Sequence, residues 1–182
     1  MKLKLSEIIL LVLDEAGSPL RGRTRMQKVM YFLCRRLGVD AEYSPHYYGP
    51  YSEQVAGAVD SLVARGLVRE VVESASTGGP FEGKIYEYVL EDRARELVSS
   101  IEELNGVEAK GVREHYGELL SANPSTQALA VASKLDIILT GSGPATGDQL
   151  QVEAKKYGWP MSQNQVQDGI EFLFDKGFAD PA

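Results

Sequence analysis

Apolar residues in the first third of the chain recur at helical spacing. Over residues 5–15 they fall at positions i, i+3, i+4, i+7 and i+8, which places them on one face of a helix. A second helix is predicted from about Thr24, an N-cap residue type that precedes another apolar stripe. A third is predicted over residues 52–65, with Gly66 placed to end it. The glycine- and proline-containing segment 17–22 is interpreted as the turn that ends the first helix.

The period then changes to that of β-strands. Residues 67–74 and 84–90 are rich in β-branched and aromatic side chains with partial alternation, and the segment between them contains glycines and a proline, which suit a hairpin loop. Three helices followed by a two-stranded hairpin is the element order of a winged helix. We therefore predict a mainly α-helical fold with a small β-hairpin.

Helical spacing returns after the hairpin, over about 91–104, 110–121 and 125–139. Further on, Thr146 and Ser162 each begin a capping-box pattern, in which the cap hydroxyl and a glutamine three residues later satisfy each other's backbone amides. These patterns predict two helices joined by a short turn, which is a helix-turn-helix arrangement.

An internal similarity links the two halves of the chain. Residues 58–68 and 169–179 align without gaps and share a leucine, a basic residue, a glycine and the apolar residue that follows it. Together with the surrounding helices, this similarity suggests tandem winged-helix-like modules. We predict a winged-helix-like domain with a hairpin wing over 1–90, a helical connector over 91–140, and a second helix-turn-helix module over 141–182 whose wing is truncated or absent.

An aromatic turn separates the second and third helices. Pro45 and Pro50 restrict the backbone, and Gly49 allows a tight turn. Ser52 is a natural cap for the helix that follows. We interpret the segment as a stiff elbow without catalytic chemistry. The tyrosines at 47, 48 and 51 are expected to wedge it against the first two helices, and the alternative is that a hydroxyl reaches outward to form one rim of a binding site.

The most basic stretch covers residues 20–36, which contain six Lys or Arg residues and no acid. On a helix, four of them fall on one side, away from the apolar stripe, and Phe32 lies within that side. Such a patch is suited to phosphates or to an acidic protein surface. The alternative is a solvated helix face neutralised by the acidic rest of the molecule. Phe32 favours a covered surface, and the cover is either a partner or another helix of the same chain.

These observations define the candidate site. We expect partner or phosphate binding by two groups of side chains, the basic residues of this stretch and two tyrosines of the turn. The candidate residues are Arg21, Arg23, Arg25, Lys28, Arg35, Arg36, Tyr48 and Tyr51.

Charge argues against DNA recognition by the third helix. The chain has a formal net charge of −7, whereas duplex affinity depends largely on neutralised phosphates. Residues 1–68 carry nine Lys or Arg and seven Asp or Glu, a balance of +2, so any basic surface is local. The outward face of the third helix presents Glu53 and Asp60 where a groove-reading helix offers Arg, Lys, Asn or Gln.

Few residues suit catalysis or metal binding. Cys34 is the single cysteine, and His46 and His115 lie far apart in the sequence with no recognisable nucleophile beside them. Disulfides and a zinc site are therefore not expected. We expect no catalytic residues, no metal and no cofactor.

A family resemblance rests on three segments, 23–32, 47–55 and 62–68. They resemble the YwgA-like family of uncharacterised prokaryotic proteins and, more distantly, the Panacea antitoxin domain, in which a Leu-Gln-Lys-like helix precedes an aromatic-Gly-Pro turn. Met26 stands where that pattern has leucine. The resemblance covers about residues 5–90 and implies a winged-helix-like fold with a regulatory or protein-binding role and no established reaction. The matching residues are Gln27, Lys28 and Tyr31 in the helix, and Tyr48, Gly49, Pro50, Tyr51 and Ser52 in the turn.

We therefore expect a non-enzymatic, cytoplasmic regulatory module, antitoxin-like or adaptor-like, whose partner is a protein. The alternative is a winged-helix DNA-binding transcriptional regulator, which leaves nucleic acid as a second class of partner. A homodimer also stays open, because tandem winged-helix modules often pair. No membrane partner is expected, since no apolar segment approaches the length that spans a bilayer.

Overall fold

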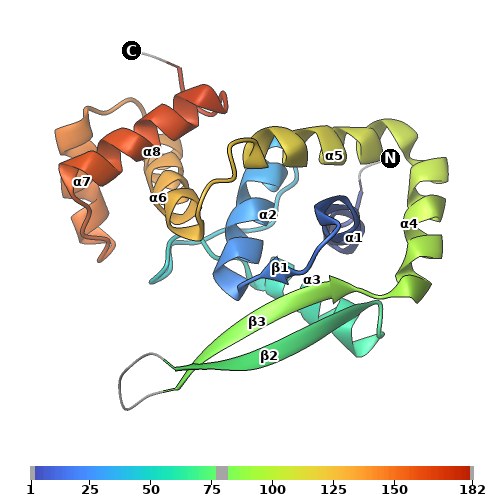
Figure 1. Cartoon of the computed structure of the whole chain (residues 1–182). Helices are drawn as coiled ribbons and strands as arrows, with labels where there is room; N and C mark the ends of the chain where they lie inside the picture. Colours follow the sequence, from blue (N-terminus) through green and yellow to red (C-terminus); the bar gives the residue numbers. More distant parts are fainter. Residues whose placement is uncertain (1–2, 77–81, 181–182) are drawn as a thin grey trace.

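A computed structural model describes residues 3–76 and 82–180 and contains, within them, eight helices and three strands (Figure 1). The prediction of a mainly helical fold with a small β-structure is confirmed. The predicted hairpin loop lies partly outside the described residues. The elements are α1 (Leu5–Ala16), β1 (Leu20–Arg21), α2 (Arg23–Leu37), α3 (Glu53–Ala64), β2 (Val68–Ser76), β3 (Glu82–Leu90), α4 (Asp92–Leu104), α5 (Gly106–Leu120), α6 (Thr126–Ser142), α7 (Gly147–Lys156) and α8 (Gln163–Asp175).

The sheet has three strands in the order β1-β3-β2, all antiparallel. The segment 17–22, predicted only as a turn, contains β1, with Leu20 opposite Tyr88 and Arg21 opposite Glu87. A two-residue strand is too short to show a periodic pattern, which is why the sequence gives no sign of it. With β1 in place, the first ninety residues have the helix and strand order of a winged helix (Figure 1).

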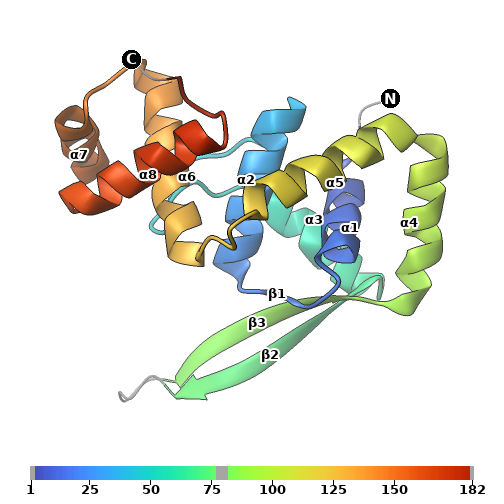
Figure 2. The ribbon, with the colours of Figure 1, turned by 45° about the horizontal axis from the view of Figure 1, so that its top comes forward.

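Two helices form the centre of the molecule. α1 packs against α3, α4, α5 and β3, and all six of its residues from Ile8 to Leu13 are buried. α2 packs against α5 and α6, and every residue from Met26 to Cys34 is buried. Figures 1 and 2 show α4 and α5 turning back over α1, with α6, α7 and α8 on the other side of α2. Since both helices are covered on several sides, neither keeps a simple polar face.

The last three helices pack on one another, and both predicted capping boxes form. The end of α8 repeats the end of α3. The Leu67 amide donates to the Leu62 carbonyl at 3.0 Å, and the Phe178 amide donates to the Leu173 carbonyl at 2.8 Å. The glycine within each closing turn has a positive φ, near +60°. The repeated sequence therefore has repeated geometry. The packing groups α6 with α7 and α8, while the boundaries at residues 90 and 140 stay a prediction.

The contact between α6 and α8 depends on Gly169. A Cβ added there would lie 2.6 Å from Leu135 Cδ1 and 2.9 Å from Val131 Cγ1. Both distances are shorter than ordinary contacts, so both side chains must shift; Leu135 is fully buried and valine has a stiff χ1, which makes these shifts unfavourable. We expect Gly169→Ala to lower the free energy of unfolding by about 1 kcal/mol. The free-energy cost of overpacking is larger than the stabilisation from the higher helix propensity of alanine.

Gly57→Ala is the matched control. Gly57 also lies inside a helix, α3, and a Cβ there would meet nothing within 4 Å. This variant should raise the free energy of unfolding by about 0.5–1 kcal/mol. Urea denaturation of both variants measures the two shifts. An equal stabilisation by both would contradict the tight α6–α8 contact.

Candidate functional site

The eight predicted site residues lie in separate places. Arg21, Arg23, Arg25 and Tyr48 line one groove, and Arg36 lines a second cavity. Lys28 and Arg35 bond to other parts of the chain. Tyr51 and Arg23 share a small hollow beside α3. The residues therefore do not form the single basic face that the helical spacing suggests.

Lys28 corrects the expectation of an exposed basic side on α2. Its side chain is only 2 % exposed, and its Nζ donates to the Pro50 carbonyl at 2.5 Å. Burial, with the nearby charge of Lys134, lowers the pKa of the Lys28 amine to about 7. The lysine is therefore a structural side chain that fixes the aromatic turn to α2.

Gln27 fixes the same turn through two further hydrogen bonds. Its Nε2 donates to the Ser52 carbonyl at 3.0 Å, and its Oε1 accepts from the Ser52 amide at 3.0 Å. The Ser52 hydroxyl accepts from the Val55 amide and donates to the Ala41 carbonyl. The predicted cap of α3 is thus formed and tied to α2. The Gln-Lys and Gly-Pro-Tyr-Ser segments that carry the family resemblance bind each other.

The turn itself is a short antiparallel hairpin. Ser44 and Tyr51 exchange two backbone hydrogen bonds, and His46 and Gly49 exchange two more around a tip made of Tyr47 and Tyr48. Gly49 has φ +102°, a conformation that favours glycine. The two tip side chains are 72 % and 61 % exposed, so the expectation that they wedge against α1 and α2 is wrong. Their rings contact each other edge to face, with centroids 4.7 Å apart.

Residues of the C-terminal half contact Arg35 and Phe32 on the basic side of α2. Arg35 forms a bidentate ion pair with Asp136 of α6, at 2.7 and 2.8 Å, and the Tyr31 hydroxyl donates to the same carboxylate. Phe32 is 1 % exposed and contacts the rings of Phe172 and Phe178. The sequence left two possible covers for Phe32, a partner or another part of the same chain. The structure shows the second.

One groove brings several cations together in an open place. It has a volume of about 1010 Å³ and lies between β1, the start of α2, part of β3 and the link from α5 to α6. We call it the basic groove and define it by four cationic side chains and one exposed tyrosine on its walls. These residues are Arg21, Arg23, Arg25, Lys84 and Tyr48.

Two of these cations are already paired. Arg21 lies 3.2 Å from Glu87 and 3.5 Å from Glu73. Arg23 lies 3.2 Å from Glu70, and its guanidinium stands 3.7 Å above the centre of the Tyr86 ring. These contacts hold both side chains against the sheet. Arg21 and Arg23 therefore line the groove, but carboxylates already compensate their charges.

The other two cations keep their charge available. Arg25 donates to the Pro124 carbonyl at 2.9 Å, and among the residues that the structure describes no carboxylate pairs with its charge. Lys84 is exposed and has no hydrogen bond or ion pair within the described chain. α2 adds positive potential, because its first turn has no acidic residue and its cap, Gly22, has no side chain. A ligand carboxylate would therefore find uncompensated positive charge here.

The sequence did not point to several residues of this region. Lys84 belongs to a predicted strand, and its place in the same groove as Arg25 depends on how that strand pairs. Residues 123–126 form the opposite wall, and Trp159 donates its ring N–H to the His46 carbonyl at 2.7 Å, next to the tip of the hairpin. These contacts join segments about a hundred residues apart, so no local pattern indicates them.

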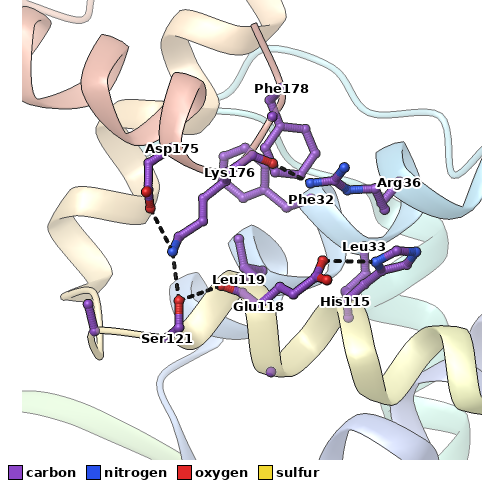
Figure 3. A pocket seen from close by; sticks show the side chains of 13 residues that line it. Phe32, Leu33, Arg36, His115, Glu118, Leu119, Ser121, Asp175, Lys176 and Phe178 are labelled. Atoms are coloured by element: carbon purple, nitrogen blue, oxygen red, sulfur yellow. Dashed lines mark hydrogen bonds and ion pairs between the residues drawn. The ribbon is translucent and has the colours of Figure 1, made fainter.

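A second cavity, of about 810 Å³, lies between α2, the end of α5 and the end of α8 (Figure 3). Arg36 stands 4.7 Å above the centre of the Phe178 ring and donates to the Lys176 carbonyl. The Lys176 ammonium contacts Asp175 and the Ser121 hydroxyl, each at 2.8 Å. Lys176 is thus paired with a carboxylate, and Arg36, which has no carboxylate partner within the described residues, is held over the Phe178 ring. The basic groove contains two cations without a carboxylate partner in that part of the chain, so it is the better candidate site.

Comparison with known proteins adds no assignment, because no family model and no curated protein matches the chain. The YwgA-like resemblance therefore stays a prediction. Within residues 3–76 and 82–180, no group of three His, Cys, Asp or Glu side chains is placed to hold a metal ion. No helix in that part of the chain is both long and apolar enough to cross a membrane.

The buried Lys28 amine predicts a pH dependence of stability. An unfolded lysine holds its proton up to about pH 10.5, whereas the folded pKa is about 7. Between pH 7 and pH 10.5, the Lys28 amine therefore gains a proton when the protein unfolds. Raising the pH within this range disfavours unfolding. In urea denaturation between pH 7 and 9, the free energy of unfolding of the wild type should rise relative to that of Lys28→Met by up to about 1.4 kcal/mol per pH unit. Parallel pH profiles would contradict a neutral buried amine.

Proposed function

We propose that the protein is a non-enzymatic regulatory module that binds a protein partner through the basic groove. One observation carries the proposal. Arg25 and Lys84 present uncompensated charge in an open groove whose rim holds the exposed Tyr48. Arginine and tyrosine, with tryptophan, are the side chains enriched at the energetic centres of protein interfaces. An antitoxin-like or adaptor-like role belongs to this class of function.

The distribution of acids favours protein over duplex DNA. Glu70, Glu73 and Glu87 lie along the sheet next to the groove. Glu53 and Asp60 are exposed on the outer face of α3, as expected from the sequence. A DNA backbone long enough to bind tightly would approach these carboxylates, and each would oppose the counterion release that drives such binding. An acidic segment of a protein can enter the groove without meeting them all.

The reactive residue types support a role without catalysis. Burial raises the pKa of the Cys34 thiol to about 12, so the thiolate needed for nucleophilic attack does not form at neutral pH. His115 lies 3.3 Å from Glu118, in the second cavity and outside the basic groove. Neither side chain lines the groove, so we assign the groove binding and no reaction.

Photo-crosslinking followed by affinity measurement tests this function. Tyr48→benzoylphenylalanine places a crosslinker at the rim of the groove, and Val107→benzoylphenylalanine places one at an even more exposed position on α5, with 85 % exposure against 61 %. Irradiation in the source cells should give a protein adduct from position 48 alone. The captured protein is then identified, purified and titrated against the wild type. Adducts from both positions would indicate non-specific capture.

Charge reversal completes the test. Arg25→Glu should raise the Kd for the purified partner at least about tenfold, because a carboxylate then meets acidic ligand groups. Lys110→Glu makes the same change of net charge on α5 and should alter Kd less than about twofold. Thermal melts confirm that both variants fold. An unchanged Kd for Arg25→Glu would overturn the assignment to this groove, and tight binding of a 20-base-pair duplex lost in Arg25→Glu would support the DNA alternative instead.

A further inference from the structure

The edge of β3 beside the basic groove has no strand on it over part of its length. β1 covers only Tyr88 and Glu87, and one further bond, from the Gly22 amide to the Tyr86 carbonyl at 2.7 Å, ends the pairing. The Gly22 carbonyl instead accepts from the Met26 amide, at the start of α2. The chain thus leaves the sheet while β3 continues toward its own first residues, still paired with β2 on its other side.

The backbone of this open edge faces the groove. In an antiparallel ladder, successive residues direct their N–H and C=O groups to opposite sides. The bond from Gly22 shows that Tyr86 faces the β1 side, so Lys84 faces the same side and Ile85 faces β2. The open groups are the Tyr86 N–H and the N–H and C=O of Lys84. Within the described chain, no loop forms a backbone hydrogen bond with these three groups.

Space and charge at this edge suit one kind of occupant. Lys84, Ile85 and Tyr86 form one wall of the groove, and residues 123–126 form the wall opposite. An extended segment placed between these walls meets the open groups of β3. A lysine on an edge strand discourages pairing with unrelated strands. Here the Lys84 charge, together with that of Arg25 on the far wall, selects for an acidic strand.

We propose that an extended acidic segment of the partner protein adds to β3 as a strand in line with β1 and antiparallel to β3. In this register its central residue pairs with Lys84, and a glutamate or aspartate at that position forms a cross-strand ion pair. Main-chain hydrogen bonds supply binding, and the side chains facing Lys84 and Arg25 supply selectivity. The inference rests on the proposed function and specifies the partner and its mode of binding.

The probe for this inference is the blocked hexapeptide Val-Glu-Val-Glu-Val-Glu. At 90 % saturation, solvent exchange of the Lys84 and Tyr86 amides should slow about tenfold in NMR, because only the free tenth of the protein exchanges. The same peptide with methylated backbone nitrogens keeps its charge, but the methyl groups remove its donors and block the close approach of a strand to β3, and Val-Lys-Val-Lys-Val-Lys reverses the charge. Neither should slow the exchange. Equal protection by either control peptide would overturn strand addition by an acidic segment.

Two variants at one position separate backbone from charge. Lys84→Pro removes the N–H that faces the groove, and the bonds to β2 are kept because proline is tolerated where the strand N–H points away from the sheet. It should raise the Kd for the acidic peptide at least about tenfold. Lys84→Gln keeps the N–H and should raise the Kd about threefold. NMR spectra of both variants check that the sheet is intact.

The outcomes also separate this inference from the proposed function. Peptide-induced shifts at Arg25 and Tyr48, without protection at Lys84 and with full affinity for Lys84→Pro, would overturn strand addition while leaving an acidic-peptide groove. If the acidic peptide does not bind at all, strand addition by an acidic segment is overturned, and the crosslinking experiment decides the proposed function by itself. Protection at Lys84 and Tyr86 that is lost in Lys84→Pro supports both.

Discussion

The hydrogen bond from the buried Lys28 amine to the Pro50 carbonyl fixes the arrangement on which the candidate site depends. With the two bonds between Gln27 and Ser52, it ties the aromatic hairpin and the start of α3 to the middle of α2. Burying an amine is unfavourable unless its polar atoms are bonded, so this contact allows few alternative positions of the turn. Tyr48 is exposed on the groove rim because the base of its hairpin is held in this way.

Local patterns account for most of the fold. Apolar spacing indicated the helices, and the capping boxes at Thr146 and Ser162 formed as expected, because both signals act within a few residues. The same reasoning failed for α2. It treats every lysine and arginine as solvated, whereas α5, α6 and α8 cover this helix through residues such as Asp136 and Phe172. Those partners are a hundred or more positions away in the chain.

The candidate site was predicted in part, for a related reason. The charge run named Arg21, Arg23 and Arg25, which do line one groove. Lys84 was not named, because its proximity to them follows from the pairing of β3 with a two-residue strand. The open edge of β3 is likewise a consequence of where the chain leaves the sheet, at Gly22. Short strands and their endpoints are set by tertiary packing, and a single sequence carries little trace of them.

The shared burial of α2 has a consequence for how the molecule unfolds. Phe32 contacts Phe172 and Phe178, and Arg35 pairs with Asp136, so separating the C-terminal helices from α2 would expose apolar rings to water and break a bidentate ion pair. Such a half-open state is costly, because it loses the contact surface without gaining the chain entropy of complete unfolding. We therefore expect the two halves to unfold together, with their cooperativity carried by the shared helix α2 rather than by a linker.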